Sequence, residues 1–326
     1  MPFLSGSSYR ASWPFSNAHV NTIYPALFRK VPPIEYERET IDTLDGDFLD
    51  LDWQKNDSRR LLIGLHGLEG NADRHYLRGL FSFFGKNGWD TLGMNFRSCS
   101  GRMNKRLRMY NMGETNDLAL VIRHVLQMGV YDEIVLSGFS LGGNVVLKYL
   151  GENGAHLPEQ IRGGVVFSVP CDIPAANVAI AHWRNRIYLK RFLSTLNEKL
   201  IEKASLYPTY LDLSGPLPRS FYEFDEQFTG PIHGYSGAQD YWQSCSSIHF
   251  MPNIIRPVLV INALDDTFLA PTCYPRKLAE NHPSVYLETP AHGGHCGFYT
   301  PSQEGSWWTE RRALAFVQEI VLNEMR

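Results

Sequence analysis

Short apolar runs alternate with longer amphipathic stretches along most of this chain, and this alternation limits the possible folds more than any other feature. The amphipathic stretches have helical length and periodicity, and the apolar runs are bounded by Gly, Asn or charged residues, as buried parallel strands are. This rhythm predicts an α/β fold, with a mostly parallel central sheet and helices on both faces. The predicted strands cover residues 61–67, 91–96, 133–138, 164–169, 257–263 and 285–288, and the predicted helices cover residues 72–86, 114–128, 141–152 and 308–325.

Two segments depart from this rhythm. Residues 35–53 alternate apolar and polar side chains around Asp45-Gly46, which predicts an antiparallel hairpin at the sheet edge. Residues 172–250 are helix-like, basic and aromatic, and they predict a helical cap inserted between strands six and seven. We therefore expect an N-terminal arm at 1–34, a core formed by 35–171 and 251–326, and a cap at 172–250.

Composition restricts the class of protein. The 326 residues are 44% apolar and can bury a large core, and the net charge of −3 provides no long-range positive field, so we expect no nucleic-acid partner. The five cysteines are an odd number without a C-x-x-C pair, which favours reduced thiols and a cytoplasmic location. No signal peptide and no transmembrane segment of roughly 18 apolar residues is recognisable. The sequence does not indicate an oligomeric state.

The segment Gly138-Phe139-Ser140-Leu141-Gly142 carries the strongest chemical signal. A G-x-S-x-G pattern is weak alone, but here it follows a predicted strand and opens a predicted helix, which is the setting of a nucleophile elbow. Glycines on either side of the serine allow strand and helix to approach closely, and the helix N-terminus directs free N–H groups at the site. Ser140 is the predicted nucleophile, and the alternative is a Gly-rich turn with an idle serine.

A serine hydroxyl needs a base and an orienting acid, which in this kind of fold follow in the order Ser, Asp, His. Loops after the last two predicted strands carry Asp265-Asp266 and the segment 291–298, rich in Gly and His. We predict Asp266 as acid and His295 as base, although spacing alone leaves Asp265 and His292 open. A metal site formed by His292, His295 and Cys296 would have poor tetrahedral geometry, so we expect neither a metal nor an organic cofactor.

An oxyanion formed during acyl transfer needs two backbone donors. The N–H of Leu141, directly after the predicted nucleophile, is one candidate. The N–H of Leu68, after the strand that ends in His66-Gly67, is the other, unless these residues form a plain β-turn. Four positive charges at residues 102–108 form either a solvated loop or a contact for an anionic substrate.

Six segments together resemble the YheT-like family of α/β-hydrolases, which is related to plant embryogenesis-associated and animal abhydrolase-domain proteins. The resemblance covers nearly the whole chain and implies Ser140, Asp266 and His295 as nucleophile, acid and base, with short-chain esterase or acylglycerol lipase activity. Ser98 departs from the expected glycine, and Tyr110-Asn111-Met112 replaces a Tyr-His-Ser-like run, which affects substrate preference. The six segments are 17–29, 95–101, 113–115, 138–144, 240–246 and 292–298.

The predicted function is therefore hydrolysis of a small-molecule carboxylic ester of short to medium acyl chain, through an acyl-enzyme. A thioesterase or acyltransferase would share the same residues, and a non-catalytic binding protein of the same fold is a third interpretation. The aromatic residues of the cap form either its own small core or a wall of the substrate site. These residues are Phe221, Tyr222, Phe224, Phe228, Tyr235, Tyr241 and Trp242.

Overall fold

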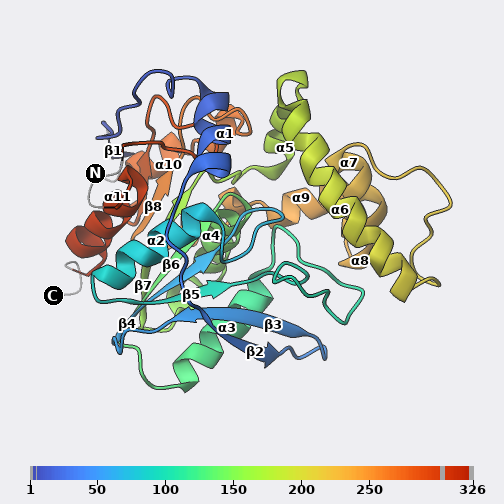
Figure 1. Ribbon diagram of the computed structural model, residues 1–326, viewed down its shortest axis with the longest axis horizontal. Helices are drawn as coiled ribbons and strands as arrows, with labels where there is room; N and C mark the ends of the chain where they lie inside the picture. Colours follow the sequence, from blue (N-terminus) through green and yellow to red (C-terminus); the bar gives the residue numbers. More distant parts are fainter. Residues whose placement is uncertain (1–2, 5, 302–304, 323–326) are drawn as a thin grey trace.

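The computed structural model describes residues 3–4, 6–301 and 305–322, and the described strands form one sheet with helices around it (Figure 1). Nine strands lie in the order β1-β9-β8-β7-β6-β4-β5-β3-β2. They are β1 (Phe3–Leu4), β2 (Glu37–Asp42), β3 (Phe48–Gln54), β4 (Arg60–Leu65), β5 (Asp90–Met94), β6 (Glu133–Phe139), β7 (Ile161–Phe167), β8 (Val258–Ile261) and β9 (Val285–Glu288).

The sheet is parallel except at one edge. Strand β3 pairs antiparallel with both β2 and β5, and every other neighbouring pair is parallel, which confirms the predicted edge hairpin and the mostly parallel sheet. Strand β1, which pairs with β9, was not predicted because two residues are too few to form a recognisable pattern. The helical insertion therefore lies between β7 and β8, which are the sixth and seventh strands only when β1 is left out of the count.

The helices confirm the predicted α/β alternation. Helices α2, α3 and α4 lie within a few residues of their predicted ranges, and the predicted closing helix is α11, continued by a π-helical turn at Val317–Val321. The end of that prediction, 323–325, lies outside the described residues. The helices are α1 (Ala18–Phe28), α2 (His75–Lys86), α3 (Thr115–Gln127), α4 (Leu141–Asn153), α5 (Ile173–Ala181), α6 (Arg186–Leu206), α7 (Phe221–Phe224), α8 (Gly230–Ile232), α9 (Ala238–Cys245), α10 (Arg276–Asn281) and α11 (Trp308–Phe316).

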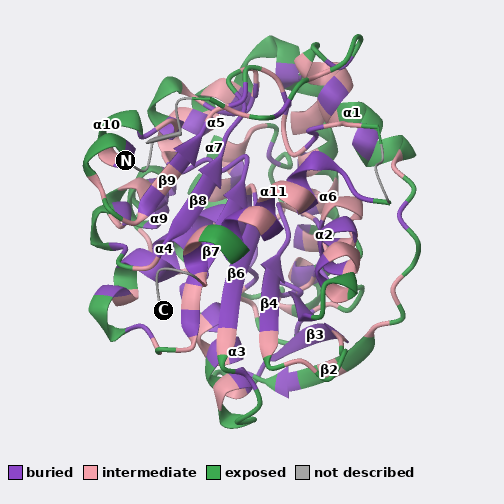
Figure 2. Ribbon diagram, turned by 90° about the vertical axis from the view of Figure 1, so that its left-hand side faces the viewer, coloured by how far each residue is buried: buried purple, intermediate pink, exposed green. Residues whose placement is uncertain are grey.

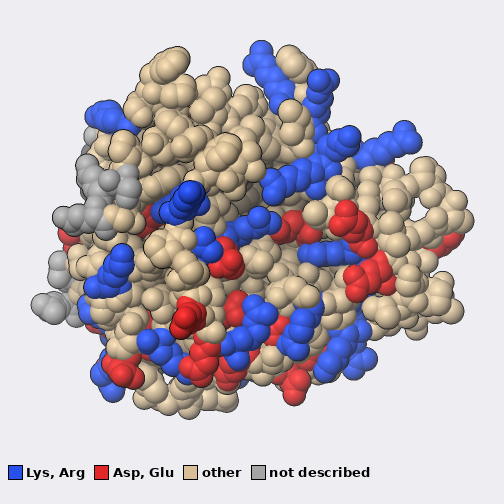
Figure 3. Space-filling view, viewed as in Figure 1, with Lys and Arg blue, Asp and Glu red and all other residues tan. Residues whose placement is uncertain are grey.

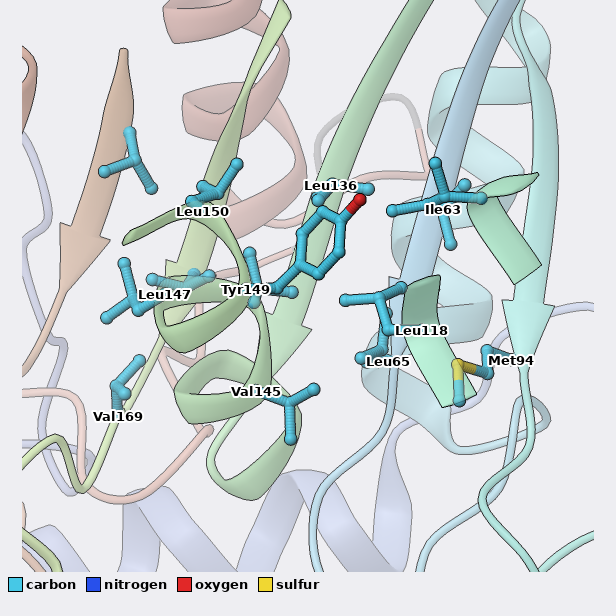
Figure 4. Close-up of a cluster of buried hydrophobic side chains, with 14 of the residues drawn as sticks. Ile63, Leu65, Met94, Leu118, Leu136, Val145, Leu147, Tyr149, Leu150 and Val169 are labelled. Atoms are coloured by element: carbon cyan, nitrogen blue, oxygen red, sulfur yellow. The ribbon is translucent and has the colours of Figure 1, made fainter. Parts of the chain in front are cut away.

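Alternate side chains of each buried strand enter two separate apolar cores. On β4, Leu61 and Ile63 contact the core under α3 and α4, whereas Leu62 contacts the core under α2 and α11. Figure 4 shows side chains of α3 and α4 packed against the first of these faces. Figure 2 shows the sheet as the buried centre of the molecule, with the exposed residues on the surrounding helices and loops. Burial on both faces explains why the strands are continuous apolar runs.

The segment between β7 and β8 contains helices α5 to α9, and its buried side chains form most of two small apolar clusters, one of which also includes Met109. Asn144 on α4 connects the base of this segment to the core. Its side-chain amide donates to the carbonyls of Met112 and Cys245 at 2.8 and 2.9 Å, and its side-chain oxygen accepts from the N–H of Ser247 at 3.0 Å. Because Asn144 lies one turn after the predicted nucleophile, the same helix orients both features.

The state of the cysteines and the character of the helices bear on the composition of the chain. All five cysteines are free thiols, and four of them are buried. Across the described ranges, no helix combines the length and the apolar character needed to cross a bilayer.

Candidate active site

Ser140 occupies a sharp turn between β6 and α4. Its backbone has φ 53° and ψ −118°, a region that non-glycine residues rarely adopt and that functional sites maintain through their surroundings. The flanking glycines make the turn possible, since a Cβ on Gly138 would lie 2.4 Å from the carbonyl of Gly142, and one on Gly142 would lie 2.5 Å from the carbonyl oxygen of Leu65. The close approach expected from the sequence is therefore present on both sides of Ser140.

The structure brings together the three side chains predicted as nucleophile, base and acid. Nε2 of His295 lies 2.9 Å from Oγ of Ser140, and Nδ1 of His295 lies 2.8 Å from Oδ2 of Asp266. The side chain of Asp266 is fully buried and that of His295 is 10% exposed. Phe268 stacks on the imidazole, with ring centroids 4.2 Å apart. The imidazole is therefore held between a carboxylate and a hydroxyl with little freedom to turn.

Electrostatics favour a proton on this imidazole. Burial by itself lowers the pKa of His295, but the attraction and hydrogen bond of the Asp266 carboxylate, together with the neighbouring Cys296, raise the pKa above the ordinary 6.5. An ionised Asp266 can only accept, so it assigns the hydrogen of a neutral ring to Nδ1 and leaves the lone pair of Nε2 directed at Ser140. This arrangement suits a base that takes a proton from a hydroxyl.

The rival residues, Asp265 and His292, lie on the same two loops but do not contact Ser140. Nδ1 of His292 is 3.4 Å from Oδ2 of Asp265, and neither atom has a hydrogen-bond partner among the described residues. The other carboxylate oxygen of Asp265 accepts from the N–H of Gly294 at 2.9 Å. In the described chain, no group of three His, Cys, Asp or Glu side chains gathers as metal ligands would.

The loop that carries His295 is supported by residues that sequence reasoning missed. The N–H of His295 donates to Oγ1 of Thr22 on α1 at 2.9 Å, and the N–H of Cys296 donates to Oγ of Ser168 at 2.8 Å. Asn21, fully buried, accepts from the N–H of Tyr299 at 2.8 Å. The only available signal was the resemblance of residues 17–29 to the family, which gives no chemical role by itself. The N-terminal arm thus contributes to the site through its contacts with this loop.

The loop after β4 holds the predicted second oxyanion donor. His66 is buried, and burial lowers its pKa to about 3, so its ring is neutral. Its Nδ1 lies 2.7 Å from the carbonyl oxygen of Gly67, and its Nε2 accepts from the N–H of Phe96 at 3.1 Å. These contacts give His66 a role beyond that of a plain turn residue. Leu68, two residues after His66, lines the same pocket as Ser140 and Leu141.

Glu69, directly after Leu68, was not singled out by the sequence. Its backbone has a positive φ of 54°, its N–H donates to the hydroxyl of Tyr110 at 2.9 Å, and its carbonyl accepts from Arg74 at 2.8 Å. The carboxylate accepts from the Tyr110 hydroxyl at 2.6 Å and from Nζ of Lys199 on α6 at 2.9 Å. The loop beside Leu68 is therefore connected directly to the inserted helices.

An apolar pocket lies between the sheet core and the inserted helices, and Ser140 and His295 line it. Residues 110–112, which the sequence comparison with the resembled family singled out as a departure, also line it. Phe221, Phe224 and Tyr241 are the aromatic residues from the predicted set that reach it.

The remaining aromatic residues of the insertion have other surroundings. Trp242 donates from Nε1 to Asp225 at 2.7 Å and belongs to a small cluster within the insertion. Phe228 is buried in the second cluster, whereas Tyr222 is 49% exposed. The aromatic set is therefore divided between residues that line the pocket beside Ser140 and residues that pack within the insertion or face solvent.

The positive charges at 102–108 lie outside the pocket. Arg102 forms an ion pair with Asp50, and Arg108 forms one with Glu114. None of the four basic side chains lines the pocket that holds Ser140. Arg102 thus connects its loop to β3, Arg108 connects it to the start of α3, and neither contributes to this pocket.

Comparisons with known proteins agree with the geometry. Residues 60–302 match the family model described as alpha/beta hydrolase fold. The Escherichia coli protein named "Putative esterase YheT" is 33% identical over 91% of this chain and 88% of its own length, and mouse phospholipase ABHD3 is 27% identical over 98% and 80%. A solved Pyrococcus furiosus esterase superimposes with a TM-score of 0.59 at 19% identity, covering 88% of this chain and 92% of that protein. The predicted fold class is confirmed.

Proposed function

This chain belongs to the α/β-hydrolase family and to the group within it that includes YheT, and on this basis we propose that it hydrolyses carboxylic esters through an acyl-enzyme on Ser140. A fold hosts many chemistries, so the proposal depends on the site. The observation that carries it is the continuous contact from Ser140 through His295 to a buried Asp266.

The proposed reaction has two steps. Nε2 of His295 takes the proton of Ser140 as Oγ attacks the ester carbonyl, and the resulting imidazolium gives that proton to the leaving alcohol. A water molecule, deprotonated by the same ring, then attacks the acyl-enzyme, and the ring returns that proton to Oγ of Ser140 as the carboxylic acid leaves. Asp266 keeps the tautomer correct and stabilises the imidazolium in both steps.

The negative oxygen of each tetrahedral intermediate needs donors that are already oriented. Leu141 is the first residue of α4, so its N–H has no partner within the helix. We assign it and the N–H of Leu68 to this oxygen, because both residues line the pocket beside Ser140. The contacts of His66 and Glu69 on either side of residues 67–68 keep that loop in place.

Residues 172–250 serve as the cap that selects the acyl chain. Helices α5 and α6 contribute Ile180, Phe192 and Leu196 to the pocket wall, and Phe224 adds an aromatic ring. Walls of this kind favour an apolar chain, with up to ~0.8 kcal/mol for each buried methylene until the pocket is full. We therefore propose short to medium acyl chains as substrates.

Labelling with a fluorophosphonate tests the nucleophile. We expect the probe to modify Ser140 in the native chain, as mapped by mass spectrometry, and native protein to hydrolyse p-nitrophenyl butyrate. The Ser140→Ala variant should fold, react with neither reagent and serve as the matched control. Hydrolysis of acyl thioesters in preference to oxygen esters, or acyl transfer to an added alcohol in preference to water, would replace the esterase assignment. Absence of labelling in a folded native protein would reject the proposal.

A series of p-nitrophenyl esters from acetate to palmitate tests the cap. We expect kcat/KM to rise with chain length, peak at short to medium chains and then fall. Phe224→Ala should move this peak because Phe224 lines the pocket, whereas Tyr222→Ala should not because Tyr222 is half exposed outside it. Equal profiles in both variants would show that Phe224 does not select the chain.

A further inference from the structure

The corner between α5 and α6 has an unusual charge distribution. Residues 173–197 contain four Lys and Arg and no Asp or Glu, although the whole chain has 34 acidic and only 31 basic residues. All four basic side chains are exposed. Figure 3 shows Lys and Arg side chains standing out at the upper end of these helices. The four are Arg184, Arg186, Lys190 and Arg191.

Large apolar side chains are exposed at the same corner. Val178 is 75% exposed, Trp183 is 67% exposed and Ile187 is 68% exposed. The guanidinium of Arg184 lies 5.5 Å from the centre of the Trp183 ring. A single exposed apolar residue is common on a protein surface. Here three of them lie among four exposed cations, so the surface is both apolar and positively charged. We call these three apolar and four basic residues the α5–α6 corner.

The α5–α6 corner is the outer side of the pocket wall. The inner face of α5 places Ala176 and Ile180 in the pocket, and the inner face of α6 places Phe192 and Leu196 there. The two helices therefore separate the pocket from whatever covers the corner.

Helix α1 contacts α6 next to this surface. Nδ1 of His19 lies 3.0 Å from the hydroxyl of Tyr188 on α6, and Figure 1 shows α1 and α5 at the same end of the molecule. Leu27 and Phe28 on α1 are 61% and 60% exposed. Residues 1–34 also contain no Asp or Glu. Two acid-free segments that are far apart in the sequence thus meet at one end of the fold.

We propose that the α5–α6 corner docks on a lipid surface that carries anionic headgroups. Its cations match the headgroup charge, and Trp183 and Ile187 are side chains that enter the boundary between headgroups and acyl chains. The overall charge of −3 does not prevent this docking, because salt screens charges that lie more than about 8–10 Å away. Docking would place the pocket wall against the lipid, whichever ester the enzyme cleaves.

Sedimentation with vesicles tests the proposal without depending on catalysis. The probes are vesicles of diether phosphatidylcholine with one quarter diether phosphatidylglycerol, and vesicles of diether phosphatidylcholine alone, since neither contains an ester that the enzyme could cleave. The native full chain should bind the anionic vesicles and bind the zwitterionic ones much more weakly, and added salt should release it. No binding of the native chain to anionic vesicles overturns the proposal.

A triple substitution tests the charges. Arg184→Gln, Arg186→Gln and Lys190→Gln together should weaken binding to anionic vesicles by between about tenfold and a hundredfold. Each side chain is exposed, so folding should be retained, and a thermal melt checks this. If the triple variant fails to fold, the single variant Lys190→Gln, expected to lose a few-fold in binding, takes its place.

A matched triple variant removes three exposed cations elsewhere. Lys86→Gln, Arg123→Gln and Lys277→Gln change the net charge by the same amount, but they lie on α2, α3 and α10. This control should bind the vesicles nearly as well as the native chain. An equal loss in both triple variants would show that overall charge, and not the α5–α6 corner, governs binding, and would overturn the proposal.

A second pair of variants tests the apolar contribution. Ile187→Ser should weaken binding to anionic vesicles several-fold, whereas Leu44→Ser, at a 90% exposed position in the turn between β2 and β3, should not. Size-exclusion chromatography of the same proteins tests the competing occupant. A native dimer that Ile187→Ser converts to a monomer, together with no vesicle binding, would show that the corner joins two copies of this chain and would overturn the lipid assignment.

Discussion

Two Asp–His pairs lie on the same two loops, yet their surroundings differ. The two aspartates are adjacent in sequence, and the two histidines are three residues apart. Asp266 and His295 are 2.8 Å apart, nearly buried and in contact with Ser140. Asp265 and His292 are 3.4 Å apart, with side chains 18% and 44% exposed, and do not reach it. Residue type is identical in the two pairs, so burial and direction distinguish them.

Local backbone contacts explain the difference. One carboxylate oxygen of Asp266 accepts from the N–H of Phe268 at 2.9 Å, which turns this side chain inward, and the other faces His295. Asp265 instead accepts from the N–H of Gly294, one residue before His295. The outer pair thus contacts the backbone of the loop, whereas the inner pair has the contacts that the proposed proton transfer requires.

The base should show the largest contrast. His295→Ala should lower kcat by about 10⁶-fold, since residues that act as a unit fail together. His292→Ala should change kcat by less than about tenfold, because a partly exposed loop side chain contributes little. Steady-state kinetics on one p-nitrophenyl ester measures both variants. A larger loss in His292→Ala would mean that the ring facing Ser140 is not the base.

The acid should follow. Asp266→Asn should lower kcat by roughly 10⁴-fold, the loss expected when the orienting carboxylate of a triad becomes an amide that favours the wrong tautomer. Asp265→Asn keeps an acceptor for Gly294 and should retain most of the activity. Comparable losses in the two variants would contradict the separation of roles.

The pH dependence of kcat/KM should change when the inner aspartate is substituted and stay the same when the outer one is. His295 must be neutral to accept the proton of Ser140, so kcat/KM falls as the pH drops below the pKa of His295, which Asp266 raises above 6.5. Asp266→Asn removes that attraction, lowers the pKa and moves the acidic limb of the profile to lower pH. Asp265→Asn should leave the limb in place. A limb that stays fixed in Asp266→Asn would show that another group titrates.

The sequence predicts the elements that depend on local pattern. Continuous apolar runs identify the buried strands because both faces of the sheet are covered, and the glycines around Ser140 identify the elbow because only they permit its close contacts. The resemblance also anticipates a glycine at position 98, and the structure explains why, since Ser98 has a positive φ of 63°.

Contacts between distant segments could not be predicted in this way. Thr22 and Ser168 support the His295 loop across 273 and 128 residues of chain, and Lys199 contacts Glu69 across 130. No local pattern marks such residues, because their roles arise only after the sheet assembles. The choice between Asp265 and Asp266 belongs to the same class, since it depends on which carboxylate meets Gly294 and which meets His295, both on a loop 29 residues away.

The smallest expected effect isolates the supporting role of the outer pair. Asp265→Ala removes the acceptor for the N–H of Gly294, whereas Asp265→Asn retains an oxygen at the same place. Loss of one such hydrogen bond costs about 1 kcal/mol, which corresponds to roughly a fivefold change in an equilibrium between loop conformations. We therefore expect Asp265→Ala to lower kcat by a few-fold and the melting temperature slightly, with the acidic limb unmoved. Asp265→Asn should restore kcat and stability together, because support of Gly294 requires an oxygen and no charge. If Asp265→Asn were as impaired as Asp265→Ala, the negative charge itself would matter, and the two pairs would act as one electrostatic unit around His295.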